Sequence, residues 1–472
     1  MQSETNHAST AGQLRPVLGL FSAGAIVVGG VIGTGVFLKP SKIAKDFLET
    51  GQGVEAASGY VPLIILLWVV CGIVNLCGAL ALAELSAMMP HAGGTYVFLR
   101  EAYGRIWGFL WGWAEFWVIR SGSIAALAAG LTIFMTEFLK AMGVTVPDHL
   151  QKPFGIGMPI CVILCLAGVN MLGVRWGGAV QNITTIIKAG VVAFLGVLPF
   201  LATRSHPIDF GALRSVTVEA SVLAAIGAAL SGIMWAYDGW GNVTVVAEEI
   251  RNPRVNLPRA LSIGVIILTL LYTGANVAYH SLLPIEAVAK ESQTAVAVTK
   301  LLFGDLGAKF MLAMLMISVF GALNSNVLVG PRIVFAVARD YRFLGPLRRI
   351  DPRSGTPALA IGILSAWSCL LILAGTFSPD ANKRLFDVLT EYCLFGGSLF
   401  YLAAVVAVFV MRVKSPDADR PYRTWGYPVV PMVFVAFYVL FLSGMVWTSP
   451  VESVAGLLLI GTGVVIYAVA RK

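Results

Sequence analysis

The feature that most constrains this chain is its succession of long apolar segments. A helix needs about 20 mostly apolar residues to cross a bilayer, and in lipid every backbone polar group must be satisfied within a helix or a closed barrel. We therefore expect an all-α polytopic membrane protein with twelve transmembrane helices. The twelve segments cover residues 17–38, 62–89, 104–138, 157–173, 178–202, 220–245, 259–283, 308–338, 357–377, 385–411, 429–448 and 451–470.

The composition excludes a soluble globular enzyme. Soluble domains carry charge on about a quarter of their residues, whereas 12% of these 472 residues are charged and 57% are hydrophobic. The six cysteines lie within apolar segments and the five histidines are dispersed, so we expect no cofactor and no metal site. Cys161 and Cys165 are one helical turn apart, but no histidine lies near them and packing explains them better.

The basic residues are distributed unevenly between the loops. The larger share of the 33 Lys and Arg residues falls in loops on the side of the two termini. Because basic loops stay in the cytoplasm, we expect a multi-pass protein of the cell (inner or plasma) membrane with both termini cytoplasmic. The lipid bilayer then accounts for the net charge of +8, and no nucleic-acid partner is expected.

Two apolar segments contain glycine-bearing interruptions at corresponding positions, at Gly33-Thr34-Gly35 and at Ala236-Tyr237-Asp238-Gly239. Several transporter folds repeat a structural unit and bind substrate where two helices are broken near the membrane midplane. The two segments lie five apart, which predicts a 5+5 repeat, inverted because five is odd. The expected division is a cytoplasmic tail at 1–16, a ten-helix core at 17–411 with repeats at about 17–202 and 220–411, and two additional helices at 429–470.

The two interruptions would expose different backbone groups. Unwinding at Gly33–Gly35 frees N–H groups at the positive end of the following half-helix, which suits a carboxylate. Unwinding at Ala236–Gly239 frees carbonyl groups, which suit an ammonium group, so a zwitterion would bridge the two. The alternative is that Gly29-x-x-x-Gly33 only permits close helix packing, although packing does not explain Asp238 in the middle of a segment.

Ionisable residues inside apolar segments are costly and point to function. Lys188 lies about 15 Å deep, which is far for its side chain to reach the interface. We interpret it as a cation that organises the break near Gly33; the alternative is an ion pair with Asp238 or Glu115. Glu115 and Arg120 are five residues apart, do not share a helical face, and are expected to pair with neighbouring helices. The remaining residues of this kind are Glu391 and, in expected interface or gate networks, Glu84 and Arg332.

Several motifs occur together and in the order typical of a known family. They are Gly33-Thr34-Gly35-Val36-Phe37, Ala83-Glu84-Leu85, Gly93-Gly94-x-Tyr96, Trp235-Ala236-Tyr237-Asp238-Gly239-Trp240, Glu248-Glu249-Ile250-x-Asn252-Pro253, Phe320-Gly321-x-x-Asn324 and Arg420-Pro421-Tyr422-Arg423. Through them nearly the whole chain resembles the amino acid–polyamine–organocation superfamily, and within it the L-type amino acid transporter family. The resemblance implies a leucine-transporter-type fold of ten core helices plus two, with alternating access.

The resemblance also implies residue roles. Backbone around Gly33–Gly35 would hold the substrate carboxylate, carbonyls near Trp235 its ammonium group, and Trp235 would cover the substrate as an aromatic lid. Lys188 is similar to a helix 5 lysine that lies where sodium-coupled relatives bind an ion, which implies sodium-independent transport. The implied substrate-binding residues are Val31, Ile32, Gly33, Thr34, Gly35, Ile119, Ser123, Trp235, Ala236, Tyr237, Asp238 and Gly239. The implied coupling or gating residues are Lys188, Trp235 and Asn324.

A further implication concerns protein partners. In animal members of the family, a cysteine in the loop after helix 3 bonds a single-span glycoprotein. The corresponding stretch, 139–156, contains no cysteine. We therefore expect no disulfide-linked heavy chain, as in a bacterial stand-alone member.

The function expected from these observations is sodium-independent secondary transport of amino acids, most simply exchange of neutral L-amino acids, and not enzymatic catalysis. If Asp238 faces the pocket, a cationic amino acid or a polyamine becomes the next candidate, and proton-coupled symport is a further alternative. Two hypotheses belong to other classes. One is an intramembrane enzyme using Glu84, Glu115 or Glu391, and the other is an amino acid sensor without turnover.

Overall fold

The computed structural model describes residues 14, 16–51, 53–203, 205–375, 385–448 and 450–470, and this part of the chain is helical. Its only strand-like pairing is an isolated parallel bridge between Leu18 and Ile250. The α-helices are α1 Leu20–Val31, α2 Gly35–Leu48, α3 Gly53–Met88, α4 Thr95–Tyr103, α5 Arg105–Ala114, α6 Arg120–Ala141, α7 Asp148–Leu172, α8 Val174–Leu201, α9 Ala220–Tyr237, α10 Pro253–Leu282, α11 Ile285–Lys290, α12 Thr294–Asp340, α13 Ala358–Gly375, α14 Leu385–Lys414, α15 Val429–Thr448 and α16 Pro450–Ala470. The other helices are the π-helix η1 Glu115–Ile119 and the 3₁₀-helices η2 Phe210–Ser215, η3 Trp240–Glu249 and η4 Arg342–Arg348.

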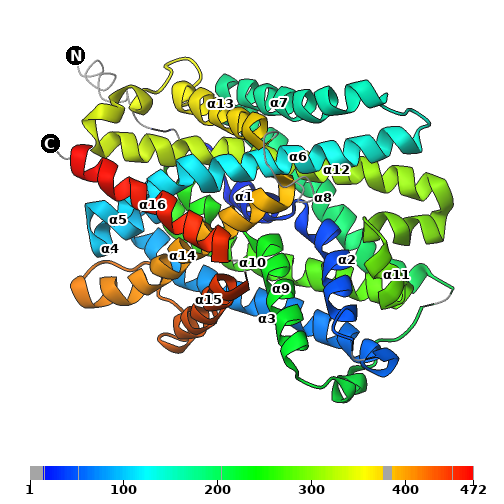
Figure 1. Ribbon diagram of the computed structural model, residues 1–472. Coiled ribbons are helices and arrows are strands. Elements are labelled where there is room, and N and C mark those ends of the chain that lie inside the picture. Colours follow the sequence, from blue (N-terminus) through cyan, green and yellow to red (C-terminus); the bar gives the residue numbers. More distant parts are fainter. Residues whose placement is uncertain are drawn as a thin grey trace, which may run out of the picture.

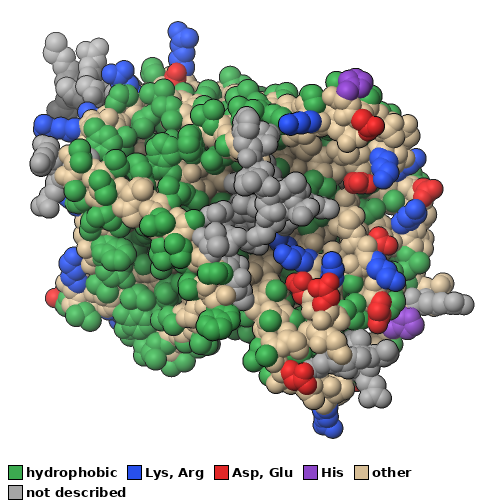
Figure 2. Space-filling view, in the orientation of Figure 1, with side chains coloured by type: hydrophobic (Ala, Val, Ile, Leu, Met, Phe, Trp, Pro, Cys, Tyr) green, Lys and Arg blue, Asp and Glu red, His purple; other side chains and the backbone are tan. Residues whose placement is uncertain are grey.

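Most of these helices have the length and composition of membrane spans. Within the described residues, eleven are long and apolar enough to cross a bilayer, and a shorter apolar helix follows at Ser453–Val469. The surface agrees, because hydrophobic side chains cover the part of the molecule around α14, α15 and α16 in Figure 2. The prediction of an all-α polytopic membrane protein is confirmed, while the count of twelve spans is not.

Several helices extend beyond the apolar segments that predicted them. The first span continues through α2 to Leu48 and the fourth begins at Asp148, about ten residues outside the expected limits in each case. The eighth forms part of α12, which bends at Gly304, where φ is +64°. Hydropathy marks the residues that lie within the hydrocarbon layer, whereas a helix continues for as long as its backbone hydrogen bonds do. The expected limits were therefore too narrow.

The helices pack as two groups joined by two further helices. In one group α10 packs on α1 and α3, and α9 packs on α2; in the other, α6, α7, α12 and α13 pack on one another (Figure 1). Helix α8 contacts α1, α10 and α12, while α14 contacts α3 and α6. Each group combines helices from the N-terminal and the C-terminal parts of the core. The inverted relation between the halves and the division at 17–202 and 220–411 stay predictions.

Both expected interruptions are present. Helix α1 ends at Val31, the next three residues are not helical, and α2 begins at Gly35. Helix α9 ends at Tyr237; Asp238 is extended, and Gly239 has a φ of +106°, which favours glycine. The chain then continues as the 3₁₀-helix η3. Helices 1 and 6 of the predicted order are therefore discontinuous.

Candidate functional site

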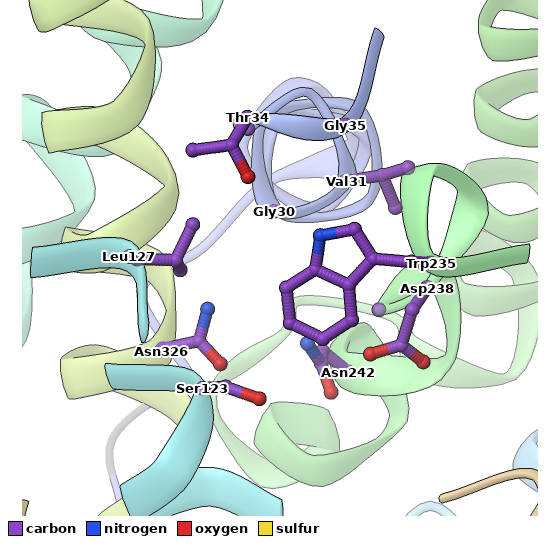
Figure 3. Close-up of a pocket in the computed structure, with 12 residues that line it drawn as sticks. Gly30, Val31, Thr34, Gly35, Ser123, Leu127, Trp235, Asp238, Asn242 and Asn326 are labelled. Carbon is purple, nitrogen blue, oxygen red and sulfur yellow. The ribbon is translucent and has the colours of Figure 1, made fainter. Parts of the chain in front are cut away.

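A small buried cavity lies where the two interrupted helices meet (Figure 3). Its volume is about 30 Å³. The indole of Trp235 extends across it, with Thr34 and Gly35 on one side and Ser123, Asn242 and Asn326 on the other. The lining residues are Gly30, Val31, Gly33, Thr34, Gly35, Ser123, Leu127, Trp235, Asp238, Gly239, Asn242 and Asn326.

Eight of the twelve residues expected to bind substrate line this cavity, and four do not. Ile32 is fully buried, and its carbonyl accepts a hydrogen bond from Lys188. Ala236 is the residue that Gly35 packs against. The other two lie elsewhere, because Tyr237 packs on Trp68 and Tyr272, and Ile119 lies against Gly396 of α14.

Four lining residues were not among the expected site residues. Gly30 is the last residue but one of α1, and Asn242 follows the second break, in η3. Leu127 lies one helical turn after Ser123, so the helical period could have identified it. Asn326 is a polar residue in an apolar segment, which by itself suggests a functional role. Its place at the cavity could not be predicted, because it depends on the packing of α12 on α6.

One wall of the cavity offers free backbone donors. Within the described residues, the N–H groups of Gly33, Thr34 and Gly35 donate to no acceptor; the first bonded N–H of α2 is that of Phe37, 3.2 Å from the carbonyl of Thr34. Free N–H groups at a helix start also carry the positive end of the helix dipole. This wall suits a carboxylate.

Another part of the cavity wall lies at two helix ends, which offer carbonyl groups. Helices α1 and α9 both end at the cavity, so the negative ends of their dipoles meet there. Tyr272 Oη lies 3.1 Å from the carbonyl oxygens of both Val31 and Ala236 and ties the two ends together. This wall suits an ammonium group.

Lys188 holds the interrupted helix in place through backbone carbonyls. It is fully buried, and its ammonium donates to the carbonyls of Gly29, Ile32 (2.9 Å) and Ser318 (3.3 Å). These three acceptors use its three N–H donors. Gly321 leaves the necessary room, because a Cβ there would lie 3.2 Å from Lys188 Nζ. The alternative pairing of Lys188 with Asp238 or Glu115 is therefore not what the structure shows.

Glu115 and Arg120 form a buried ion pair, contrary to the expectation that they would pair with other helices. Arg120 Nε lies 2.9 Å and Nη2 3.1 Å from the two carboxylate oxygens of Glu115. The expectation was wrong because residues 115–119 form a π-helix. Its hydrogen bonds join residues five apart, so it places Arg120 directly over Glu115.

The same guanidinium also joins three helices beside the cavity. Arg120 donates to the side-chain oxygens of Asn326 of α12 at 2.6 Å and Asn242 of η3 at 2.8 Å. Both asparagines line the cavity. The position of α6 is thereby coupled to α12 and η3.

The remaining ionisable and polar residues from the sequence lie outside the cavity. Asn324 forms hydrogen bonds with Asn170, Gly177 and Gln181, between α7, α8 and α12. Glu84 accepts from Arg412 at 2.7 and 2.9 Å, and Arg332 pairs with Glu249 at 3.0 Å. Both are ion pairs between elements distant in the sequence, and their role in an interface or gate network stays a prediction. The side chain of Glu391 is outside the described residues.

A buried cavity between two interrupted membrane helices, with free N–H donors and helix-end carbonyls at the breaks, is typical of a secondary transporter. A family profile described as amino acid permease matches residues 18–470. The chain belongs to the amino acid permease family, and it is a transporter and not an enzyme.

Individual relatives support the family assignment along nearly the whole chain. It is 32% identical over 433 residues to the serine/threonine exchanger SteT of Bacillus subtilis, covering 90% of this chain and 91% of the relative. It is 31% identical over 449 residues to the human b(0,+)-type amino acid transporter 1, covering 91% and 82%. It is 29% identical over 472 residues to the mouse large neutral amino acids transporter small subunit 2, covering 99% and 83%. The resemblance seen in the motifs is confirmed.

Removing one member of the buried ion pair should destabilise the protein strongly. Glu115→Ala leaves the Arg120 guanidinium buried beside the cavity without its counter-ion, which costs about 3–5 kcal/mol. We expect a clearly lower midpoint of thermal unfolding in detergent. The double variant Glu115→Met, Arg120→Met removes both charges and should recover much of the loss. A double variant as unstable as the single one would contradict this role for the pair.

A methyl group on Gly35 should separate the two interrupted helices. A Cβ at this position would lie 2.5 Å from Ala236 Cα, so α2 and α9 must move apart. Overpacking of this kind costs about 1–3 kcal/mol, and Gly35→Ala should weaken substrate binding roughly five-fold or more. Gly24→Ala is the control, since no atom lies within 4 Å of a Cβ there. Equal affinities of the two variants, measured by ligand binding to purified protein, would contradict the close contact.

Proposed function

We propose that the protein exchanges neutral L-amino acids across the membrane, independently of sodium, by alternating access. The observation that carries the proposal is the pair of complementary walls in the cavity. The free N–H groups of Gly33, Thr34 and Gly35 and the carbonyl ends of α1 and α9 all lie at this cavity. Such a site fits the carboxylate and ammonium groups shared by all α-amino acids and leaves the side chain to the other walls.

The size and lining of the cavity favour small side chains. The cavity that Trp235 helps to line has a volume of only about 30 Å³. Ser123, Asn242 and Asn326 add polar groups to the wall opposite the break. The serine/threonine exchanger SteT, 32% identical, carries the same preference in its name. We place serine, threonine and alanine first among the substrates.

Sodium independence rests on Lys188. Its ammonium occupies the carbonyl groups of Gly29 and Ile32 on the broken helix and of Ser318 on α12. Carbonyl oxygens of broken helices are the groups that coordinate a coupling ion in transporters of this type. With a fixed cation already bound to them, no sodium ion is needed to stabilise the break, and exchange of one substrate for another is the simplest cycle.

A cationic amino acid is the second candidate because Asp238 lines the cavity. The sequence suggested a cationic amino acid or a polyamine as the next candidate if Asp238 faces the pocket. The carboxylates of Asp238 and Glu115 and the guanidinium of Arg120 together leave one negative charge around the site, which a cationic side chain would neutralise. The neutral substrate is preferred because the cavity is small.

The proposal includes the placement of the protein in the cell. We infer a multi-pass protein of the plasma membrane with cytoplasmic termini, because the basic loops lie on the side of the termini. Since the stretch 139–156 has no cysteine, the protein is proposed to work without a disulfide-linked heavy chain.

Transport assays with the purified protein in liposomes test the function directly. Liposomes loaded with serine should take up labelled serine faster than unloaded ones, equally well in sodium and in choline buffer. Unlabelled alanine should compete, arginine should compete weakly, and putrescine should not. Inhibition by putrescine alone would overturn the zwitterion site, and uptake that needs sodium would overturn the coupling. Binding without any counterflow would indicate a sensor.

Lys188→Ala should strongly slow transport while the protein still folds. A hydrogen bond to a charged group contributes about 1.5–3 kcal/mol, so losing the ammonium should cut the exchange rate at least roughly ten-fold. Size-exclusion chromatography and thermal unfolding report on folding, and labelled serine counterflow reports on transport. The control is Lys300→Ala, at an exposed lysine that pairs with Asp305 at 3.5 Å. Unchanged counterflow in Lys188→Ala would end the proposed role.

A further inference from the structure

A second cavity is lined by other residues of the same π-helix. It measures about 220 Å³ and is enclosed by α5, η1, the end of α12 and η4. Every side chain in its wall is apolar, and its one remaining lining residue is Gly112. The wall includes Phe109, Phe116, Trp117, Val337, Leu344 and Leu347.

The size and lining of this cavity call for an apolar occupant. Protein interiors are packed so closely that voids larger than a water molecule are few, and an apolar cavity of about 150 Å³ holds a molecule of benzene. This one is larger. Phe343, in its wall, is 51% exposed, so the cavity reaches the molecular surface. It fits several methylene groups of a chain entering from outside.

Three exposed arginines accompany the cavity. Arg342 directly precedes the lining residue Phe343, Arg348 directly follows Leu347, and Arg349 comes next. Within the described part of the chain, none of the three has an acidic partner. They lie on the face that carries most of the basic loops, where membrane proteins meet lipid headgroups.

The acidic residues nearest in sequence are engaged elsewhere and do not neutralise these arginines. Asp340 accepts hydrogen bonds from Tyr96 at 2.6 Å and from Arg100 at 2.5 Å. The backbone N–H groups of Ser354 and Arg353 donate to Asp351 and lower its pKa. The positive charge of Arg342, Arg348 and Arg349 is thus left for an anion from outside the chain.

We propose that this cavity binds one acyl chain of an anionic phospholipid, whose phosphate group lies against Arg342, Arg348 and Arg349. The apolar wall binds the acyl chain, and the arginines favour a negatively charged headgroup. A neutral phospholipid could fill the cavity but would leave the three positive charges unmatched. The proposal concerns a lipid of the surrounding bilayer and is independent of the transported substrate.

Photo-crosslinking in liposomes tests the site. The probes are phosphatidylglycerol and phosphatidylcholine, each with a diazirine in the same acyl chain, and the labelled peptides of the full-length protein are mapped by mass spectrometry. We expect phosphatidylglycerol to label residues 109–117 and 343–347 more strongly than phosphatidylcholine does. Because the readout is labelling, it is valid whether or not the protein exchanges amino acids.

Two sets of variants separate the headgroup from the chain. Each basic residue near the membrane surface contributes about 1 kcal/mol to binding of anionic lipid, or roughly five-fold. The triple variant Arg342→Gln, Arg348→Gln, Arg349→Gln should therefore lose most of the phosphatidylglycerol labelling. Its control, Arg251→Gln, Arg259→Gln, Arg423→Gln, removes three exposed arginines elsewhere and should lose little. Leu347→Trp fills the cavity and should reduce labelling by both lipids, whereas Leu359→Trp, at an exposed site on α13, should not.

The possible outcomes decide between distinct occupants. Labelling of both segments that falls in the arginine variant and in Leu347→Trp supports the proposal. Equal labelling by the two lipids, unchanged in the arginine variant, would overturn the selection of an anionic lipid. Labelling confined to other helices, or no labelling above background, would overturn the site itself.

Discussion

The structure depends on the groups that replace the lost backbone hydrogen bonds at two helix breaks inside the membrane. An unpaired carbonyl in hydrocarbon costs several kcal/mol, so a helix can be interrupted there only where other groups replace the lost hydrogen bonds. Lys188 supplies three donors to carbonyls around the break in helix 1, and Tyr272 Oη lies within hydrogen-bonding distance of the ends of α1 and α9. The carbonyls are thus held by side chains, while the N–H groups of Gly33–Gly35 stay free. That asymmetry leaves the cavity able to bind a carboxylate.

Arg120 extends this constraint to the other group of helices. Its carboxylate partner is on its own helix, so the pair needs no further charge and the guanidinium can donate outward to Asn242 and Asn326. Each of these residues belongs to a different element, and Asn242 follows the break in helix 6. Any movement of α9 and η3 relative to α6 must change these hydrogen bonds. Arg120 therefore connects the state of the cavity to the relative position of the two helix groups.

The glycines show which parts of the site could be predicted from the sequence and which could not. The breaks at Gly33–Gly35 and Gly239 were predictable, because glycines at matched positions in apolar segments are the signal of a discontinuous helix. Gly29 has the packing role that was the alternative, since a Cβ there would collide with Thr185 of α8. The contact of Gly35 with Ala236 was not predictable, because it depends on how two distant segments meet. Nor was the π-helix, since no residue type in 115–119 marks a change from four-residue to five-residue hydrogen bonding.

The π-helix η1 places different side chains on two cavities. Glu115 pairs with Arg120 beside the substrate cavity, while Phe116 and Trp117 line the apolar cavity near η4. A π-turn inserts one residue into a helix, so keeping both sets of contacts requires that the turn persists. An occupant of the apolar cavity packs against Phe116 and Trp117 and so stabilises the turn that aligns Arg120 with Glu115. By linkage, the proposed acyl chain would favour the conformation in which Arg120 reaches Asn242 and Asn326. The π-helix thus connects the apolar cavity to the residues beside the substrate cavity.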